Sequence, residues 1–92
     1  MSILSENEIA ARLADLSGWK LEGKEIRCTF KLPSFPAAIA FVTNVAFLAE
    51  AASHHPDIDI RYNNVTLALT THDAGGLTAK DFDLATQIDE IL

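Results

Sequence analysis

Two short runs of alternating apolar and polar residues, joined by Asn63-Asn64, constrain the fold of this chain more than any other feature. Every second position on either side of the two asparagines is apolar or aromatic: Ile58, Ile60, Tyr62, Val65, Leu67 and Leu69. A period of two is typical of a β-strand with one buried face, and asparagine tolerates the positive φ of a tight turn. We therefore predict an antiparallel hairpin in which Tyr62 pairs with Val65 and Ile58 pairs with Leu69.

A second hairpin is predicted earlier in the chain, over residues 19–32. Its second run has apolar residues at alternate positions: Ile26, Cys28, Phe30 and Leu32. If Gly23-Lys24 forms the turn, Leu21 lies opposite Ile26 and Trp19 lies opposite Cys28. Each of the two hairpins therefore has one apolar face that requires a second layer to cover it.

Two helices are predicted near the ends of the chain. The first covers about residues 6–16, starts with a capping box from Ser5 to Glu8, and stops near Gly18. The other starts with a capping box from Thr78 to Asp81. Apolar residues then follow at helical spacing: Phe82, Ala85, Ile88 and Ile91.

The longest predicted helix lies between the two hairpins. Ser34 can cap its start, and Pro56 disfavours helical dihedrals at His55, so we expect the helix to stop near His54. Its apolar stripe comprises Phe35, Ile39, Val42, Val45, Ala46, Ala49 and Ala52. Phe41 and Leu48 widen the stripe, which indicates contact with more than one neighbour.

The predicted element order is αββαββα, in a single domain over residues 1–92. Two amphipathic hairpins with amphipathic helices indicate the α+β class. We expect a two-layer sandwich, in which a four-stranded antiparallel sheet carries helices packed on one face. A chain of this size buries a modest share of its surface, so self-association is a natural supplement to its stability.

The charge of the chain restricts its partners. Its formal net charge is −6, which disfavours non-specific binding to nucleic acid or to an anionic membrane surface. A small neutral or weakly polar ligand fits better. The single cysteine, Cys28, excludes an internal disulfide, and the start of the chain lacks the pattern of a signal peptide. The apolar run 37–49 is too short to span a bilayer, so we expect a cytoplasmic protein.

All three histidines of the chain are predicted to converge at one end of the second hairpin. Continuing the predicted pairing past Pro56 places His55 opposite His72. His54 lies at the end of the long helix, and Glu50 precedes it by four residues, so a carboxylate could fix its tautomer. Three imidazoles and a carboxylate predict general acid–base chemistry on a small polar ligand.

Other interpretations of these residues remain open from the sequence. Catalytic zinc can be held by three histidines, but the adjacent side chains of an extended His54-His55 point to opposite faces. A non-catalytic binding module could keep the same pocket. Asp81 also has a structural explanation, as the third residue of its capping box. Nucleophilic catalysis is disfavoured, because no serine or cysteine lies in a recognisable nucleophile motif.

The spacing of the polar residues resembles the signature of the pterin-4a-carbinolamine dehydratases. The motif is Glu50-x-x-x-His54-His55-Pro56, followed by Tyr62, His72 and Asp81. Ser17-Gly18-Trp19, Thr71-His72 and Gly76-Leu77-Thr78 agree with it, so the resemblance extends from about residue 8 to 91. Ile58 and Arg61 depart from the family pattern, and they lie along the strand rather than at the histidines.

The resemblance implies an activity and a set of site residues. The activity is loss of water from a 4a-hydroxytetrahydropterin, the product of a pterin-dependent aromatic amino-acid hydroxylase, without a metal or organic cofactor. It implies that His54, His55 and His72 are catalytic, with His54 and His72 as the acid–base pair and His55 mainly holding the pterin. Substrate-binding or orienting roles are implied for four further residues: Glu50, Ser53, Thr71 and Asp81. The family also assembles as homodimers and homotetramers.

Overall fold

The structure is a computed structural model that describes residues 2–92. Its elements in chain order are α1 (Glu6–Leu13), β1 (Lys20–Glu22), β2 (Glu25–Lys31), α2 (Phe35–Ala52), β3 (Asp57–Arg61), β4 (Asn64–Leu69), the short 3-10 helix η1 (His72–Ala74) and α3 (Ala79–Glu90). Apart from η1, which we did not predict, this is the predicted αββαββα order.

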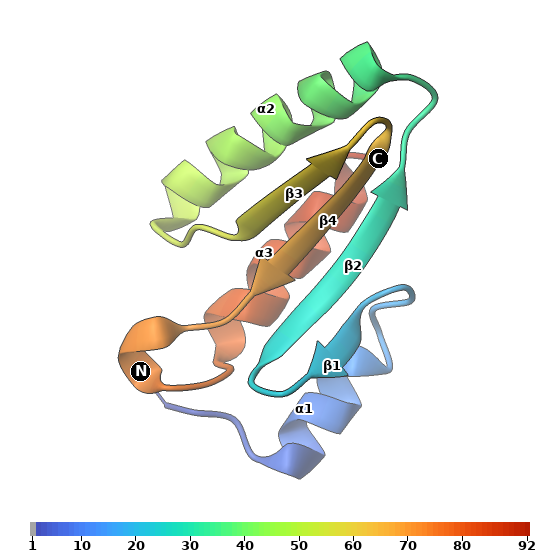
Figure 1. Cartoon of the computed structure of the whole chain (residues 1–92). Coiled ribbons are helices and arrows are strands. Elements are labelled where there is room, and N and C mark those ends of the chain that lie inside the picture. The colour runs from blue at the N-terminus through green and yellow to red at the C-terminus, as the bar shows by residue number, and fades with distance from the viewer. Residues whose placement is uncertain (1) are drawn as a thin grey trace.

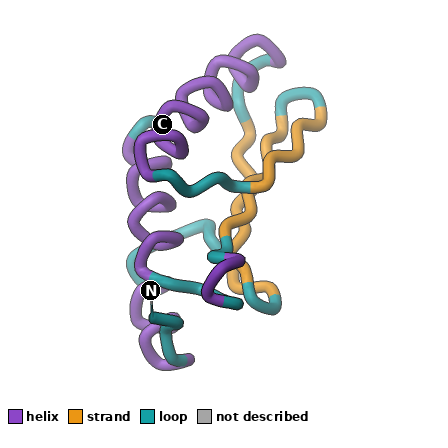
Figure 2. Tube along the Cα trace, turned by 90° about the vertical axis from the view of Figure 1, so that its left-hand side faces the viewer, coloured by secondary structure: helices purple, strands orange, loops and turns teal. Residues whose placement is uncertain are grey.

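The four strands form one antiparallel sheet in the spatial order β1-β2-β4-β3. Figure 1 shows α3 crossing behind the sheet and α2 running beside β3, and Figure 2 shows the helices on one side of the strands. The predicted α+β sandwich, with helices on one face, is therefore confirmed. Its largest fully buried apolar side chains come from both layers: Ile26, Val45, Val65, Leu67, Leu69, Leu84 and Ile88.

The first hairpin has the predicted pairing of Leu21 with Ile26. The ladder of β1 and β2 ends at Lys20, so Trp19 lies just outside it rather than in a strand pair with Cys28. The Trp19 indole is nevertheless buried, and its Nε1 donates to Asp89 Oδ1 of α3 at 2.9 Å. The tryptophan therefore ties the start of the sheet to the helical layer.

Helix α1 is shorter than predicted. The Ser5–Glu8 capping box is present, but the helix ends at Leu13 rather than near residue 16. Beyond the C-cap Ala14, the amides of Asp15 and Leu16 bond to carbonyls three residues back instead of four. This tighter turn directs Leu16 into the core, where it is buried.

The second hairpin forms, but its predicted register is wrong by two residues. Ile58 pairs with Leu67 instead of Leu69, and the two turn residues are Tyr62 and Asn63 instead of Asn63-Asn64. Because side chains alternate with a period of two, a shift of two leaves the residues that remain in the strands on their predicted faces. Tyr62, predicted to pair with Val65, instead lies in the turn and is exposed. The prediction therefore placed the apolar face correctly and the cross-strand neighbours incorrectly.

A contact outside the hairpin accounts for the observed register. The Asn63 side chain donates to the Leu32 carbonyl at 2.8 Å, and the Leu32 amide donates back to the Asn63 carbonyl at 2.9 Å. Asn64 is then already a strand residue, paired with Lys31 of β2. Tyr62 takes the positive φ of 53° that we had expected at an asparagine.

Helix α2 begins after its Ser34 cap and ends at Ala52, close to the predicted limits. Its buried residues are Ala38, Phe41, Val45 and Ala49. Phe35 and Ile39, which belong to the predicted stripe, are exposed instead. Apolar residues surround most of this helix, so their spacing could not select which side faces the sheet.

By length and composition alone, α2 could cross a membrane. It has 18 residues with a mean hydropathy of 1.6, and the expectation that its apolar run is too short is therefore wrong. Only 22% of its residues are buried in the fold. The core helix of a soluble protein meets the same criterion, and α2 packs here against α3 and β4. In this fold it serves as part of the second layer.

Candidate active site

One end of the sheet brings together segments that are distant in the sequence. The end of α2, the start of β3 and the segment between β4 and α3 all lie at this end, on the left of Figure 1. A cavity of about 260 Å³ lies at this end. Its lining includes all three histidines of the chain: Ser53, His54, His55, Thr70, Thr71, His72, Asp73 and Lys80. The structure thus places the three imidazoles around one space.

His54 is the most constrained of the three histidines. It is 8% exposed, and its Nε2 lies 2.5 Å from Asp81 Oδ1, while Asp81 itself is fully buried. Helix α2 ends two residues before His54, because Ser53 adopts the left-handed conformation at φ 51°. The chain therefore turns out of the helix axis, and the ring reaches the start of α3.

Asp81 also receives hydrogen bonds at its second oxygen. Oδ2 accepts from Thr71 Oγ1 at 2.8 Å and from the Thr78 backbone amide at 3.0 Å, within the predicted capping box of α3. The hydroxyls of Thr71 and Thr78 are 2.8 Å apart. We assign the hydrogen shared by Asp81 and His54 to Nε2, so that Asp81 accepts at both of its oxygens and Nδ1 is left for a ligand.

The predicted partnership between Glu50 and His54 is wrong. Glu50 Oε1 instead lies 2.8 Å from His55 Nε2, and both side chains are largely exposed. The prediction assumed that helical spacing continues as far as His54, but α2 ends at Ala52. Asp81, for which a capping role seemed sufficient, provides the carboxylate of His54 in addition to its cap.

The predicted cross-strand pair of His55 and His72 is absent, because β4 ends at Leu69 and β3 starts at Asp57. His72 instead begins η1, and its side chain is exposed. The loop that carries it is closed by backbone hydrogen bonds between Thr71 and Gly76, at 3.1 and 3.3 Å. No hydrogen bond from either ring nitrogen of His72 is found within residues 2–92, so both nitrogens can serve a ligand.

Three residues of the cavity lining were missed by the sequence analysis: Thr70, Asp73 and Lys80. Each is adjacent in sequence to a residue that we did identify, namely Thr71, His72 or Asp81. That proximity was the only available signal, since a lysine in the first turn of a helix or an aspartate after a strand is common on protein surfaces. Lys80 is half-buried and adds a cation to the cavity.

The described residues, 2–92, contain no group of three His, Cys, Asp or Glu side chains arranged to hold a metal ion. Cys28 lies in the core, away from the cavity, and burial raises the pKa of its thiol to about 11. The groups facing the cavity are therefore imidazoles, hydroxyls, an ammonium and a carboxylate. Together they can donate and accept protons on a bound polar ligand.

Comparison with known proteins identifies the family of this chain. A family model described as pterin 4 alpha carbinolamine dehydratase matches residues 2–91. The chain belongs to this family. The resemblance of its sequence motif is therefore confirmed, and the matched region contains every residue of the cavity.

Individual dehydratase relatives match along nearly their whole length. A relative from Roseiflexus sp. (strain RS-1), provisionally named as a pterin-4-alpha-carbinolamine dehydratase, is 76% identical, over 97% of this chain and 96% of its own. A relative from Chloroflexus aurantiacus (strain ATCC 29366 / DSM 635 / J-10-fl), named in the same way, is 72% identical over 100% of this chain and 99% of its own. A crystal structure of a transcriptional coactivator/pterin dehydratase from Brucella melitensis has a TM-score of 0.93 and 34% identity, with 98% of each chain covered.

Proposed function

We propose that this chain is a hydro-lyase that converts a 4a-hydroxytetrahydropterin into quinonoid dihydropterin and water. The observation that carries the proposal is the convergence of three imidazoles on one cavity, with one of them fixed by a fully buried carboxylate. Membership of the dehydratase family supplies the substrate class. The reaction breaks the bond between C4a and its hydroxyl and removes the proton of the neighbouring ring nitrogen.

His54 is proposed as the general base. Its Nε2 is engaged by Asp81, so Nδ1 is the nitrogen that remains to take the ring N–H proton. The buried carboxylate stabilises the positive charge that develops on the imidazole as it takes the proton. The hydrogen bonds of Thr71 and Thr78 to Asp81 hold that carboxylate in place, which gives both threonines a positioning role.

His72 is proposed as the general acid, which donates a proton to the departing hydroxyl. Its ring is exposed and has no partner within residues 2–92, so its protonation can equilibrate with solvent between turnovers. His55, oriented by Glu50, and Ser53 then contact the bound pterin from the end of α2.

The proposal is tested by adding purified protein to a carbinolamine that a phenylalanine hydroxylase generates in the same cuvette. We expect decay faster than the spontaneous reaction, and loss of most of the acceleration in His54→Gln and in His72→Gln. The double variant should lose far more activity than either single variant, with unchanged circular dichroism. Absence of acceleration by the wild-type chain refutes the proposal, and binding of a reduced pterin without turnover, measured by calorimetry, indicates a binding module instead.

We also propose that the chain acts as a homodimer or homotetramer. Four large apolar side chains are exposed on α2 and on the neighbouring edge strand β3: Phe35, Ile39, Phe47 and Ile58. Phe47 is 72% exposed, in the middle of α2. Large apolar side chains that are exposed on the surface are candidates for a subunit interface. Phe47→Glu should reduce the mass measured by analytical ultracentrifugation, whereas Gln87→Glu at an exposed position of α3 provides a control for added charge.

The proposed cellular role is recycling of the pterin that an aromatic amino-acid hydroxylase consumes, in the cytoplasm. Its substrate is the product of that hydroxylase, so the two activities are coupled by chemistry. With catalytic amounts of pterin and a reductase that uses quinonoid dihydropterin, adding this chain should raise the steady rate of hydroxylation. An unchanged rate under conditions where dehydration limits the cycle contradicts this role.

A further inference from the structure

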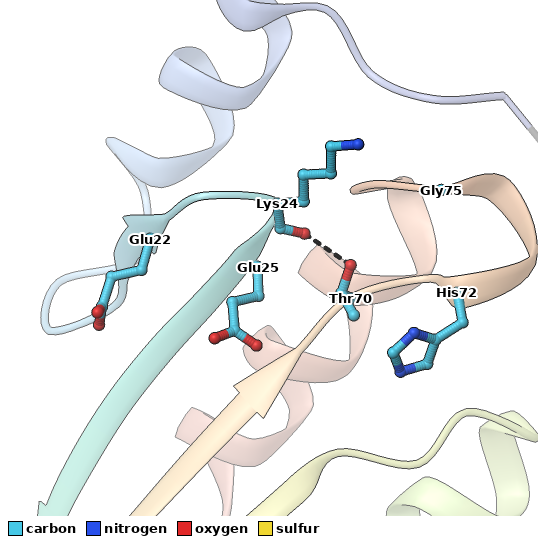
Figure 3. Close-up of a pocket in the computed structure, with 6 residues that line it drawn as sticks. All are labelled: Glu22, Lys24, Glu25, Thr70, His72 and Gly75. Atoms are coloured by element: carbon cyan, nitrogen blue, oxygen red, sulfur yellow. Dashed lines mark hydrogen bonds between the residues drawn. The ribbon is translucent and has the colours of Figure 1, made fainter.

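A second cavity adjoins the one that holds the histidines. Its volume is about 400 Å³, and its lining comprises Glu22, Lys24, Glu25, Thr70, His72 and Gly75. Figure 3 shows this cavity between the β1–β2 turn and the segment that carries His72. Two residues, Thr70 and His72, line both cavities. A ligand that contacts His72 and exceeds the smaller cavity therefore extends toward the β1–β2 turn.

The β1–β2 turn is held at a fixed distance from the histidines. Thr70 Oγ1 donates to the Lys24 carbonyl at 2.6 Å, which ties the turn to the strand that leads into His72. Leu21 and Ile26 are paired on either side of the turn. The position of the carboxylates on this turn is therefore set by the sheet rather than by a free loop.

Glu25 supplies the acceptor in this second cavity. Its carboxylate is half-buried, and Oε1 accepts from Arg27 Nε at 2.9 Å, which orients the group and leaves Oε2 for a ligand. In Figure 3 the side chains of Glu25 and His72 extend in the same direction in the view, whereas Lys24 extends in the opposite one. A ligand group beside His72 therefore meets a carboxylate more readily than the ammonium.

We propose that this second cavity is a subsite for a hydroxylated substituent of the substrate, with Glu25 as its specificity-determining residue. The inference rests on the proposed function, because it assumes that the pterin ring occupies the histidine cavity. A hydroxyl of the substituent donates to Glu25 Oε2. A substituent that ends in carboxylates is disfavoured, since Glu22 and Glu25 place like charges around it.

The test compares two carbinolamines that differ only at ring carbon C6, one with a methyl group and one with a dihydroxypropyl group. In Glu25→Met we expect kcat/KM for the dihydroxypropyl substrate to fall about 10-fold, the loss of one hydrogen bond to a charged acceptor. For the methyl substrate we expect a change within about two-fold. Glu90→Met, which removes an exposed carboxylate at the far end of α3, should alter neither value.

Equal losses on the two substrates, or no loss on either, overturn the subsite while the proposed function stands. If the wild-type chain dehydrates neither carbinolamine, the proposed function fails, and calorimetry with the two corresponding reduced pterins decides the subsite separately. The subsite is supported if the wild type binds the dihydroxypropyl pterin more tightly than the methyl pterin and Glu25→Met abolishes this preference. Equal affinities of the wild type for the two pterins overturn it. Thermal melting of each variant establishes that the fold is retained.

Discussion

Replacing Asp81 by asparagine should force His54 into its other tautomer while leaving the fold intact. Asp81 is fully buried, with Oδ2 accepting from the Thr78 amide and Oδ1 facing His54 Nε2 at 2.5 Å. The Thr78 amide can only donate, so the substituted side chain must keep its oxygen there and turn its NH₂ toward His54. Nε2 then has to accept a hydrogen bond rather than donate one, so the ring hydrogen moves to Nδ1.

The size of the effect follows from the interaction that is lost. Under the proposed mechanism, the buried carboxylate supports the imidazolium that forms when His54 takes a proton from the substrate. A hydrogen bond to a charged group contributes roughly 1.5–3 kcal/mol, and the upper end of this range corresponds to about 100-fold in rate. The wrong tautomer adds to this loss, because neutral His54 no longer has an acceptor at Nδ1. We expect kcat to fall by at least about 100-fold.

Two measurements test this reasoning. Steady-state kinetics on the carbinolamine give kcat, and ¹⁵N chemical shifts of the His54 ring report which nitrogen carries hydrogen. The matched control is Asp83→Asn, the same chemical change on an exposed residue of α3. Wild-type kcat in Asp81→Asn, or a His54 ring that keeps its hydrogen on Nε2, would refute the role assigned to the carboxylate.

Three further predictions concern exposure and burial. Glu50→Gln breaks an exposed ion pair with His55, and exposed pairs of this kind contribute about 0–1 kcal/mol. We therefore expect kcat/KM to change less than about five-fold. A loss as large as that of Asp81→Asn in the same assay contradicts this expectation. The pKa of the Cys28 thiol is raised to about 11 by burial, so the folded state favours the neutral thiol. The contribution of this pKa difference to the free energy of unfolding is complete below the unfolded pKa near 9.0 and is lost as the pH rises toward 11. The melting temperature of the wild type should therefore fall across this pH range by an amount that Cys28→Ala does not show. Leu67→Ala in the fully buried centre of the sheet should cost about 2–5 kcal/mol in urea unfolding, several times the cost of the same change at the exposed Leu21.

Local patterns in the sequence were sufficient for the elements and for their buried faces. The capping boxes that begin at Ser5 and Thr78 formed as predicted, because each depends on residues only three positions apart. The apolar faces of the strands were also correct, since a period of two is a property of the backbone. Membership of the dehydratase family was recognisable from the spacing of Glu50, His54-His55-Pro56, His72 and Asp81, because such a spacing is a property of the sequence and does not require the fold to be known.

Contacts between distant segments were beyond the reach of these patterns. The register of the second hairpin depends on Asn63 bonding to Leu32, a residue 31 positions away. On α2, apolar residues on most sides left the choice of buried face to the sheet and α3. The spacing of residues along the sequence does not reveal these contacts between distant segments. It therefore predicted a hairpin turn one residue too late and an apolar stripe on α2 that only partly matches the buried face.

The amino-acid sequence by itself determined that the histidines belong to one end of the sheet, and which family of proteins they resemble. Only the tertiary structure decided which carboxylate serves which imidazole. Ser53 ends α2 in a left-handed conformation, and His54 is thereby turned away from Glu50 toward Asp81, 27 positions along the chain. A hydrogen bond depends on the distance between two atoms in space. Here that distance is set by the direction in which the chain leaves α2, and helical spacing no longer applies beyond the end of the helix.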